Sequence, residues 1–244
     1  MKKIPKVIHY FWFGNNDKPK IFYKCLESWK KYCPDYEIKE WNESNFDINI
    51  NQYVSDAYKK KKYAFVSDYA RLYILYKYGG LYLDVDVELL KNIDNIVESN
   101  ECFMGFEDKN YVNPGLITGA IKGTYILKEI LDIYDNFTNY EEGTHTICTI
   151  VTEFLKNNYG LQDDNKKIQC LEGITIYPFE YFCAYDIISG KTYKTKNTYS
   201  IHHYNGSWLE PKDKVKNFIK KIIYCLVGKE KYYHLKAMIR KEKE

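Results

Sequence analysis

The sequence lacks any uninterrupted apolar run close to the about 20 residues that a membrane-spanning helix needs. Its start, Met1-Lys-Lys-Ile-Pro5, also lacks the long apolar segment of a secretory signal. These two absences argue against an integral membrane protein and against export. We therefore expect a cytoplasmic protein.

Paired cysteines are missing as well. The seven cysteines are scattered, odd in number and without any Cys-x-x-Cys spacing, so neither a disulfide framework nor a zinc ribbon is indicated. No stretch resembles a linker between separate domains, and 244 residues with 45% hydrophobic content can bury one sizeable core. We therefore expect one globular unit, formed by residues 1–210.

The most informative feature is a pair of carboxylates, Asp84 and Asp86, in an apolar run that follows Gly79-Gly80. The run predicts a buried strand at Leu81–Val87, in which residues two apart point to the same side. Converging carboxylates repel each other unless a hard cation and phosphate oxygens complete the site. The spacing indicates a metal and phosphate site, although acids that simply emerge into solvent are the alternative.

A second polar pair, Asp68 and Arg71, lies on the apolar segment just before this strand. Three residues apart on a helix, the two side chains share one face. Arginine suits fork-like recognition of phosphate or sugar oxygens, which favours a ligand-gripping pair beside the acidic strand. A structural ion pair on the helix surface is the alternative.

The alternation of strand-like and helix-like segments predicts an α/β fold with a mostly parallel sheet and flanking helices. Ligands of such sheets sit at the carboxyl ends of the strands, which is where Trp12 and the acidic pair would lie. The expected strands are 6–13, 36–41, 81–87, 103–106, 115–121 and 174–179, and the expected helices are 19–31, 56–78, 124–137 and 144–157.

These motifs resemble glycosyltransferase family 32, the glycosyltransferases with a DXD sugar-binding region. The family pattern Ser-Asp-x-x-Arg followed by Gly-Gly-x-Tyr-x-Asp-x-Asp is matched in full by Ser67–Arg71 and Gly79–Asp86. Looser similarity covers most of residues 4–210. The resemblance implies a GT-A-like fold with a single Rossmann-like sheet, a nucleotide-sugar-binding half at about residues 1–100 and an acceptor half at 101–210.

The resemblance also implies which residues bind the donor, a UDP-sugar. Trp12, flanked by Phe11 and Phe13, matches the family tryptophan that stacks on the uracil ring, although aromatic residues in a first strand are more often core. Tyr82 belongs to the same donor site, and Asp68, Arg71, Asp84 and Asp86 are the expected catalytic residues. His9 is expected to be a satisfied core histidine.

A second cluster of polar and aromatic residues is His202-His203-Tyr-Asn-Gly-Ser207-Trp208. An imidazole can complete an oxygen-and-nitrogen shell around Mn²⁺. The resemblance implies that His203 joins Asp84 and Asp86 as a metal ligand and that Ser207 and Trp208 contact the donor diphosphate. Which of the two adjacent histidines faces the metal stays open.

Residues 211–244 differ in composition, because eleven Lys or Arg and four Asp or Glu give them a charge of +7, against −4 for residues 1–210. Apolar residues recur at helical spacing between the lysines, which predicts a basic amphipathic C-terminal helical tail. Such a tail, at residues 212–244, suits peripheral contact with an anionic membrane, at the inner face of the plasma membrane. A helix packed on the domain is the alternative, and nucleic acid is not an expected partner.

The expected reaction is a metal-dependent, retaining transfer of a sugar from a UDP-sugar to a hydroxyl, with Mn²⁺ or Mg²⁺ as cofactor. The resemblance places it in bacterial surface polysaccharide or glycolipid synthesis, with a saccharide or lipid-linked saccharide as acceptor. Glu107, Asp108 and Asn113 are minor acceptor-side candidates. The alternatives are a haloacid dehalogenase-like phosphatase with Asp84 as nucleophile and a non-catalytic nucleotide-sugar-binding subunit.

Overall fold

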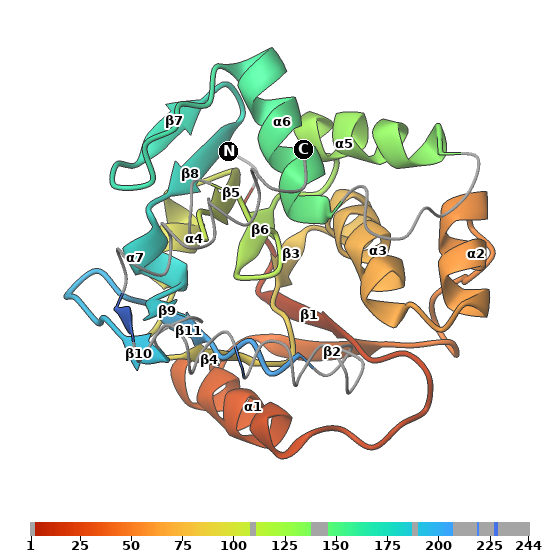
Figure 1. Ribbon diagram of the computed structural model, residues 1–244, viewed down its shortest axis with the longest axis horizontal. Helices are drawn as coiled ribbons and strands as arrows, with labels where there is room; N and C mark the ends of the chain where they lie inside the picture. The colour runs from red at the N-terminus through yellow and green to blue at the C-terminus, as the bar shows by residue number, and fades with distance from the viewer. Residues whose placement is uncertain are drawn as a thin grey trace.

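The structure is a computed structural model that describes residues 3–107, 111–137, 146–186, 190–206, 219 and 227–228. A central sheet is flanked by helices on both sides (Figure 1). This arrangement confirms the α/β fold expected from the alternation of segments.

The strands are β1 (Val7–Phe11), β2 (Glu37–Trp41), β3 (Gly80–Tyr82), β4 (Val87–Leu89), β5 (Cys102–Gly105), β6 (Thr118–Ala120), β7 (Gln169–Leu171), β8 (Ile174–Tyr177), β9 (Tyr185–Asp186), β10 (Lys191–Thr192) and β11 (Ser200–His202). The helices are α1 (Lys20–Tyr32), α2 (Gln52–Lys59), α3 (Tyr63–Tyr78), α4 (Asp94–Glu98), α5 (Tyr125–Asp135), α6 (Ile147–Tyr159) and α7 (Phe179–Phe182).

The main sheet has seven strands in the order β2-β1-β3-β6-β5-β8-β7. The pairs β1–β2, β1–β3 and β5–β8 are parallel, whereas β6 is antiparallel to both of its neighbours and β7 is antiparallel to β8. Five of the seven strands therefore run in the same direction, which confirms the mostly parallel sheet. The carboxyl ends of β1, β3 and β5 meet at one edge.

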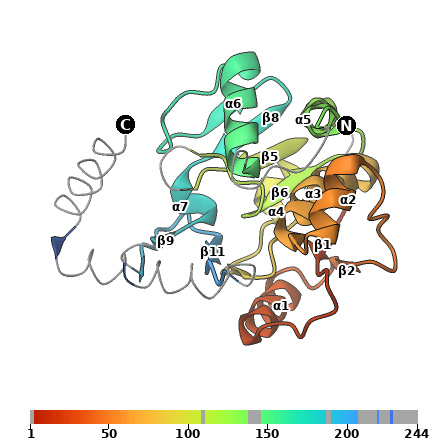
Figure 2. The same ribbon diagram turned by 45° about the vertical axis from the view of Figure 1, so that its right-hand side comes forward.

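Apolar side chains pack on both faces of this sheet. One core joins β1, β3 and β5 to α2, α3, α5 and α6, and the other joins the opposite faces of the same strands to α1, α4 and α7. Figure 2 shows α1 on one side of β1 and β2, with α2 and α3 on the other. Burial on both faces follows from the near-continuous apolar character of β1 and β3.

His9 fastens the central strand β1 to two neighbouring segments. Its Nδ1 accepts a hydrogen bond from the Trp41 indole N–H at 3.1 Å, so its Nε2 carries the proton and donates to the Gly79 carbonyl at 2.9 Å. Gly79, with φ 71°, ends helix α3, and a Cβ on Gly80 would lie 2.9 Å from the His9 ring. His9 is the satisfied core histidine that was expected, and its packing explains the second glycine.

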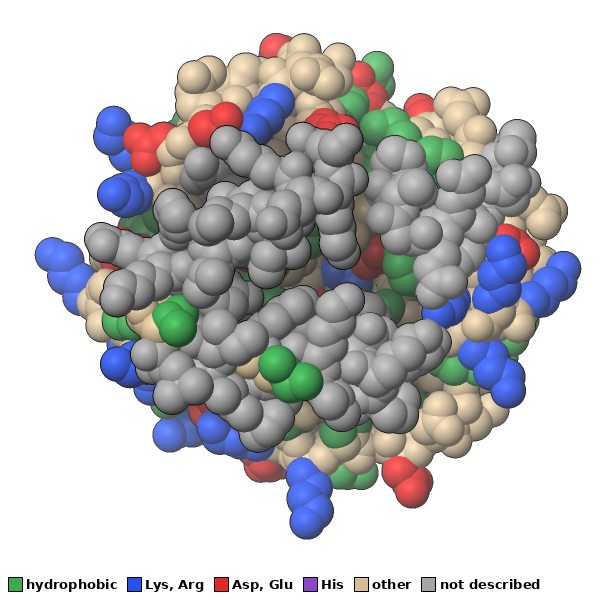
Figure 3. Space-filling model, viewed as in Figure 1, with side chains coloured by type: hydrophobic (Ala, Val, Ile, Leu, Met, Phe, Trp, Pro, Cys, Tyr) green, Lys and Arg blue, Asp and Glu red, His purple; other side chains and the backbone are tan. Residues whose placement is uncertain are grey.

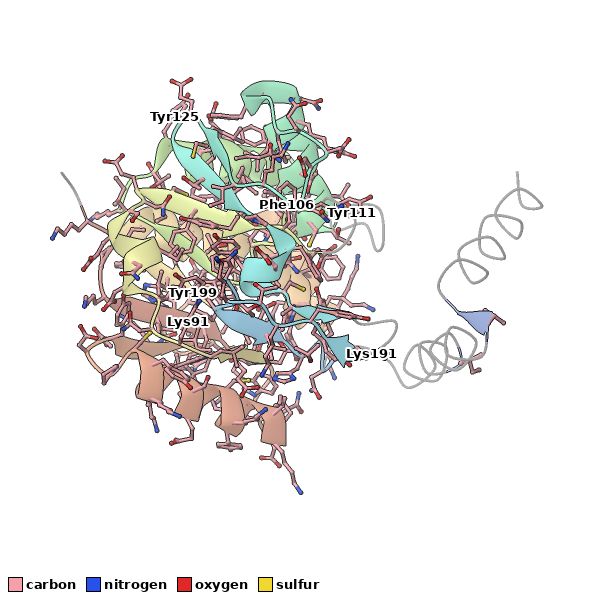
Figure 4. The ribbon with its side chains drawn as sticks, turned by 90° about the vertical axis from the view of Figure 1, so that its left-hand side faces the viewer. Lys91, Phe106, Tyr111, Tyr125, Lys191 and Tyr199 are labelled. Atoms are coloured by element: carbon pink, nitrogen blue, oxygen red, sulfur yellow. The ribbon has the colours of Figure 1, made fainter. Side chains whose placement is uncertain are left out.

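A separate two-stranded sheet pairs β4 with β11 in antiparallel register, with His202 opposite Val87. At the end of this sheet away from His202, the Leu90 N–H donates to the Tyr199 carbonyl at 2.8 Å. The Lys91 ammonium lies 3.9 Å from the centre of the Tyr199 ring. Figure 4 shows Lys91 and Tyr199 side by side. This small sheet brings residues more than 110 positions apart in sequence to the end of β3.

The predicted strand Leu81–Val87 is wrong, because the chain turns between Tyr82 and Val87. The Val87 N–H donates to the Asp84 carbonyl at 3.0 Å, which closes a turn, and β4 then leaves the main sheet to pair with β11. The predicted helix 56–78 is divided into α2 and α3 by residues 60–62.

Further elements had no sequence prediction, namely α4, β7, α7, β9, β10 and β11. All are two to five residues long. The predicted tail helix at 211–244 falls almost wholly outside the described residues. Within the described part of the chain, no helix is both long and apolar enough to cross a bilayer.

We predict that His9 makes stability depend on pH. Burial lowers the pKa of His9 from 6.5 to about 4, so in the folded protein the ring stays neutral where the unfolded chain already binds a proton. The free energy of unfolding therefore has its full value, as far as His9 is concerned, above pH 6.5. It decreases by about 3 kcal/mol as the pH falls from 6.5 toward 4.

The measurement is urea unfolding of the wild type and of His9→Gln between pH 4 and 7. Glutamine keeps a donor and an acceptor but does not titrate, so the difference between the two proteins should shrink as the pH falls. A difference that stays constant over this range would contradict the prediction.

Candidate functional site

Asp84 and Asp86 lie in the turn after β3, at the edge where the parallel strands end. The Asp84 N–H donates to the Gly115 carbonyl at 3.0 Å, so the turn is held by the loop before β6. The two carboxylates therefore converge because of this turn, and not because they alternate along one strand as the sequence argument assumed. Figure 3 shows some acidic and basic side chains near the middle of the molecule in this view.

Asp86 is a buried carboxylate, 8% exposed, that the chain keeps ionised. Its Oδ1 lies 3.0 Å from Nε2 of His202, and its Oδ2 accepts the Asn205 N–H at 2.7 Å. Burial raises the pKa of Asp86, but the His202 charge and these hydrogen bonds outweigh burial and lower the pKa to about 2. Asp86 can therefore offer a full negative charge to a cation at neutral pH.

His202 completes a possible cation site with the two carboxylates. Ligand atoms of Asp84, Asp86 and His202 all lie within 4.8 Å of one another. Burial lowers the pKa of His202, and the nearby Asp86 carboxylate more than reverses this effect and raises it. The other ring nitrogen, Nδ1, is buried and has no hydrogen-bond partner in the described residues.

His203, the histidine chosen from the sequence, lies elsewhere in the structure. Its Nε2 is 2.8 Å from Oε2 of Glu88. Ile201 pairs with Glu88 in the β4–β11 register, and His203 shares the face of Ile201 because side chains alternate along a strand. The geometry therefore offers His202, and not His203, as the nitrogen ligand beside Asp84 and Asp86.

Arg71 connects the helix pair to the acidic turn. Its Nη2 lies 3.0 Å from Oδ1 of Asp68 and 3.4 Å from Oδ1 of Asp84, and its guanidinium covers the Tyr82 ring at 4.6 Å. The Tyr82 hydroxyl in turn donates to Asp84 at 2.5 Å. The structure thus brings these predicted donor-site residues together. The pair on α3 is buried and is not the exposed surface pair of the alternative reading.

The Asp68 carboxylate is the least stabilised of these charges. Burial raises its pKa to about 6, although Arg71 acts in the opposite direction. A group with this pKa close to neutral can accept a hydrogen bond from a ligand hydroxyl, or donate one when it is protonated.

The loop before β6 packs directly on this pair. A Cβ on Gly115 would clash with Oδ2 of Asp84 and lie 2.7 Å from Nη1 of Arg71. Asn113, of which 7% is exposed, accepts the Gly115 N–H at 2.7 Å through its side chain. Asn113 was a minor candidate from the sequence, and the packing role of Gly115 was missed because a glycine in a loop has no chemical signature.

The predicted base-stacking residues separate into two groups. Phe11 and Phe13 are buried and stack on each other with ring centroids 5.7 Å apart. Trp12 is partly exposed, and its indole N–H donates to the Asn16 carbonyl at 2.6 Å. Trp12 is therefore the one of the three aromatic residues that is partly exposed. Ser207, Trp208 and Asp108 lie outside the described residues.

Two carboxylates and one imidazole suit a divalent cation that accepts oxygen and nitrogen ligands. Mg²⁺ prefers oxygen ligands and retained water, whereas Mn²⁺ also accepts a histidine nitrogen. One ligand atom from each of Asp84, Asp86 and His202 lies close enough to the others to surround such an ion, and His202 would release its proton when it binds the ion. The residues present therefore fit Mn²⁺.

Comparison with known proteins finds similarity to glycosyltransferases. Residues 19–103 match the family described as "Glycosyltransferase sugar-binding region containing DXD motif". An uncharacterized glycosyltransferase of Acanthamoeba polyphaga mimivirus is 30% identical over 171 residues, which cover 64% of this chain and 67% of the viral protein.

A yeast enzyme matches a smaller part of the chain, and one solved structure matches a part of similar size. Inositol phosphoceramide mannosyltransferase 3 of Schizosaccharomyces pombe is 32% identical over 102 residues, 38% of this chain, and the matched part is only 27% of that enzyme. Among solved structures, the PaToxG glycosyltransferase has a TM-score of 0.50 at 19% identity, and the match covers 64% of this chain and 70% of that one. This likeness shows a shared fold, the GT-A fold that the motifs implied.

We predict that Gly115→Ala weakens Mn²⁺ binding at least about tenfold, because the added methyl group displaces the Asp84 carboxylate. Titration calorimetry with Mn²⁺ measures the change. Gly173→Ala is the control for general strain, since a Cβ there meets no atom within 4 Å and its cost arises from the backbone, which has φ 75°. Equal affinity in wild type and Gly115→Ala would show that this contact does not set the position of Asp84.

Proposed function

Because the chain belongs to the glycosyltransferases with a DXD-containing sugar-binding region, we propose that it transfers a sugar from a UDP-sugar to a hydroxyl acceptor. The observation that carries the proposal is the convergence of Asp84, Asp86 and His202 beside the buried Asp68–Arg71 pair. A cation cluster next to a sugar-gripping pair is what a nucleotide sugar requires, since its diphosphate and its sugar are adjacent.

Different residues are proposed to bind different parts of the UDP-sugar donor. We propose that Asp84, Asp86 and His202 hold Mn²⁺, with Mg²⁺ as a poorer substitute. The bound cation would neutralise the charge that develops on the departing diphosphate, which is worth several kcal/mol of transition-state stabilisation. Ser207 and Trp208 remain proposed diphosphate contacts.

Asp68 and Arg71 orient the transferred sugar in this proposal. Both side chains are buried and fixed to each other at 3.0 Å, so a sugar hydroxyl would meet preorganised partners. We propose retention of the anomeric configuration, which the family relation supports, and we assign no side-chain base. Trp12 is the proposed platform for the uracil ring, because its ring is partly exposed while Phe11 and Phe13 are buried.

The acceptor side is proposed to lie in residues 101–210, opposite the donor half at about 1–100. Glu107 and Asn113 of this half both lie near the cation cluster. The name of the yeast relative refers to a ceramide lipid, which supports a saccharide or lipid-linked saccharide as acceptor. A role in bacterial surface polysaccharide or glycolipid synthesis, in the cytoplasm, is the corresponding cellular proposal.

The phosphatase alternative has lost its basis. That chemistry gives no role to Arg71 or to the Tyr82 hydroxyl, which both bind Asp84. The family match also accounts for the Asp68–Arg71 pair, which has no role in a haloacid dehalogenase-like enzyme. The non-catalytic subunit remains a competing outcome for the experiment below.

We predict UDP release from one member of a panel of UDP-sugars when Mn²⁺ is present. Asp86→Asn should lower this rate about 100-fold or more, because a neutral amide cannot balance the cation that stabilises the leaving group. Asp35→Asn, at an exposed position, is the control and should keep the wild-type rate. Binding of UDP-sugars without turnover in the presence of a broad set of saccharides and water would favour the non-catalytic subunit.

We predict that the basic segment 212–244 mediates peripheral binding to anionic membranes, since residues 211–244 carry +7. A chain ending at residue 211 should sediment with vesicles containing anionic lipid at least about tenfold less than the full chain at low salt. Vesicles of neutral lipid are the control. Unchanged sedimentation with anionic vesicles would rule out the tail as a membrane contact.

A further inference from the structure

Glu107 is a half-buried carboxylate beside the cation cluster, and the proposed reaction gives it no role. It follows β5 at the edge where the parallel strands end. Phe106 is fully buried and bridges Val112, and the Glu107 N–H donates to the Tyr111 carbonyl at 2.7 Å. Figure 4 shows Phe106 inside the molecule and Tyr111 nearer its edge. The backbone therefore fixes the point from which the Glu107 side chain extends inward.

One contact of Glu107 leads to Asp84. Its Oε2 accepts a hydrogen bond from the Asn113 side-chain amide at 2.8 Å. The oxygen of the same amide accepts the Gly115 N–H at 2.7 Å, and the Gly115 carbonyl accepts the Asp84 N–H at 3.0 Å. An unbroken series of hydrogen bonds thus runs from Glu107 through the loop before β6 to the acidic turn.

A second contact of Glu107 leads to His202, and Cys148 also hydrogen-bonds with the Glu107 carboxylate. The same Oε2 accepts the Tyr204 hydroxyl at 3.2 Å. The Tyr204 ring lies against the His202 ring, with centroids 4.0 Å apart, and its backbone is in the left-handed region with φ 48°. The chain on both sides of Tyr204 is bound to Asp86, because the N–H groups of His203 and Asn205 donate to Asp86 oxygens at 3.0 and 2.7 Å.

We infer that Glu107 is a positioning residue that joins the two chain segments from which the cation ligands extend. The inference rests on the proposed function, because it assigns Glu107 to the same cation site. Glu107 touches neither carboxylate of the cluster, but one of its oxygens binds a donor from each segment. Without this acceptor, the Asn113 amide loses its partner and the Tyr204 hydroxyl keeps only its contact with Cys183 Sγ at 3.0 Å. The hydrogen-bonded link between the two segments is then lost.

Substitutions at Glu107 can separate its role as a hydrogen-bond acceptor from the effect of its negative charge. Glutamine has nearly the shape of glutamate and keeps one carbonyl oxygen, so it can still accept from Asn113 and Tyr204. Leucine fills a similar volume and accepts nothing. If Glu107 acts by holding these two donors, Glu107→Gln should preserve the site and Glu107→Leu should not.

Asp135 provides a matched control within the same protein. Its Oδ1 accepts the Asn51 side-chain amide at 2.9 Å and the Tyr69 hydroxyl at 3.3 Å, nearly the same pair of bonds that Glu107 accepts. Asp135 ends α5 and is more exposed than Glu107, and neither of its two partners belongs to the cation cluster. Asp135→Leu therefore removes a similar pair of hydrogen bonds without removing a contact of the cation ligands.

The experiment measures the Kd for Mn²⁺ by titration calorimetry, and kcat and KM for the donor found in the panel. We expect Glu107→Leu to bind Mn²⁺ about tenfold more weakly, the scale of one lost buried hydrogen-bond acceptor. Glu107→Gln should stay within about threefold of wild type, and Asp135→Leu should be unchanged. Tyr204→Phe keeps the ring against His202 but removes one donor, so it should weaken Mn²⁺ binding about threefold.

Tyr204→Phe also keeps the test decisive if Glu107→Leu does not fold. Wild-type Mn²⁺ affinity in Glu107→Leu, or in Tyr204→Phe where the leucine variant is unfolded, would overturn the inference while leaving the proposed function intact. An equal loss in Glu107→Gln and Glu107→Leu would also overturn it, because the charge would then matter and not the acceptor. If the wild type itself binds no Mn²⁺, the proposed function fails and the inference fails with it.

Discussion

The site depends on the contact between Asp86 and His202. A carboxylate that is 8% exposed would normally take up a proton, yet His202 and the Asn205 N–H lower the pKa of Asp86 to about 2. The neighbouring Asp68 has no comparable set of donors, and its pKa is raised to about 6. Two buried acids in one site therefore have different pKa values, about 2 for Asp86 and about 6 for Asp68, because they receive different hydrogen bonds.

This contact exists only because β4 leaves the main sheet. If the chain had continued straight from β3, β4 would have stayed in the sheet and its partner β11 would have had no place beside Asp86. The turn at Asp84 instead sends β4 across α1, where the Ser28 hydroxyl accepts the Leu89 N–H at 2.9 Å and the Trp29 indole donates to Val87. Helix α1 therefore supports the cation site from behind, although no residue of α1 belongs to it.

The sequence was sufficient to predict the fold class, because strands β1, β2 and β5 and helices α1, α5 and α6 carry strong local patterns. It also predicted that Asp68 and Arg71 lie beside Asp84 and Asp86, and the structure brings these side chains together. It could not predict the turn, since an apolar run with Asp-x-Asp reads equally well as one strand. It could not separate His202 from His203 either, because that choice depends on the register between β4 and β11.

Residues that act through geometry are the hardest to find from sequence. Gly115 is needed because it has no side chain, and Glu107 is a common residue type in a segment without a distinctive motif. Both lie in the β5–β6 connection, which passes over Asp84 and Arg71 before the chain enters β6, the antiparallel neighbour of β3. The DXD motif supplies the charged groups, but their relative positions are set by this returning loop and by the segment after β11. A cation site of this kind is therefore a property of three chain segments, and a match to the motif identifies only one of them.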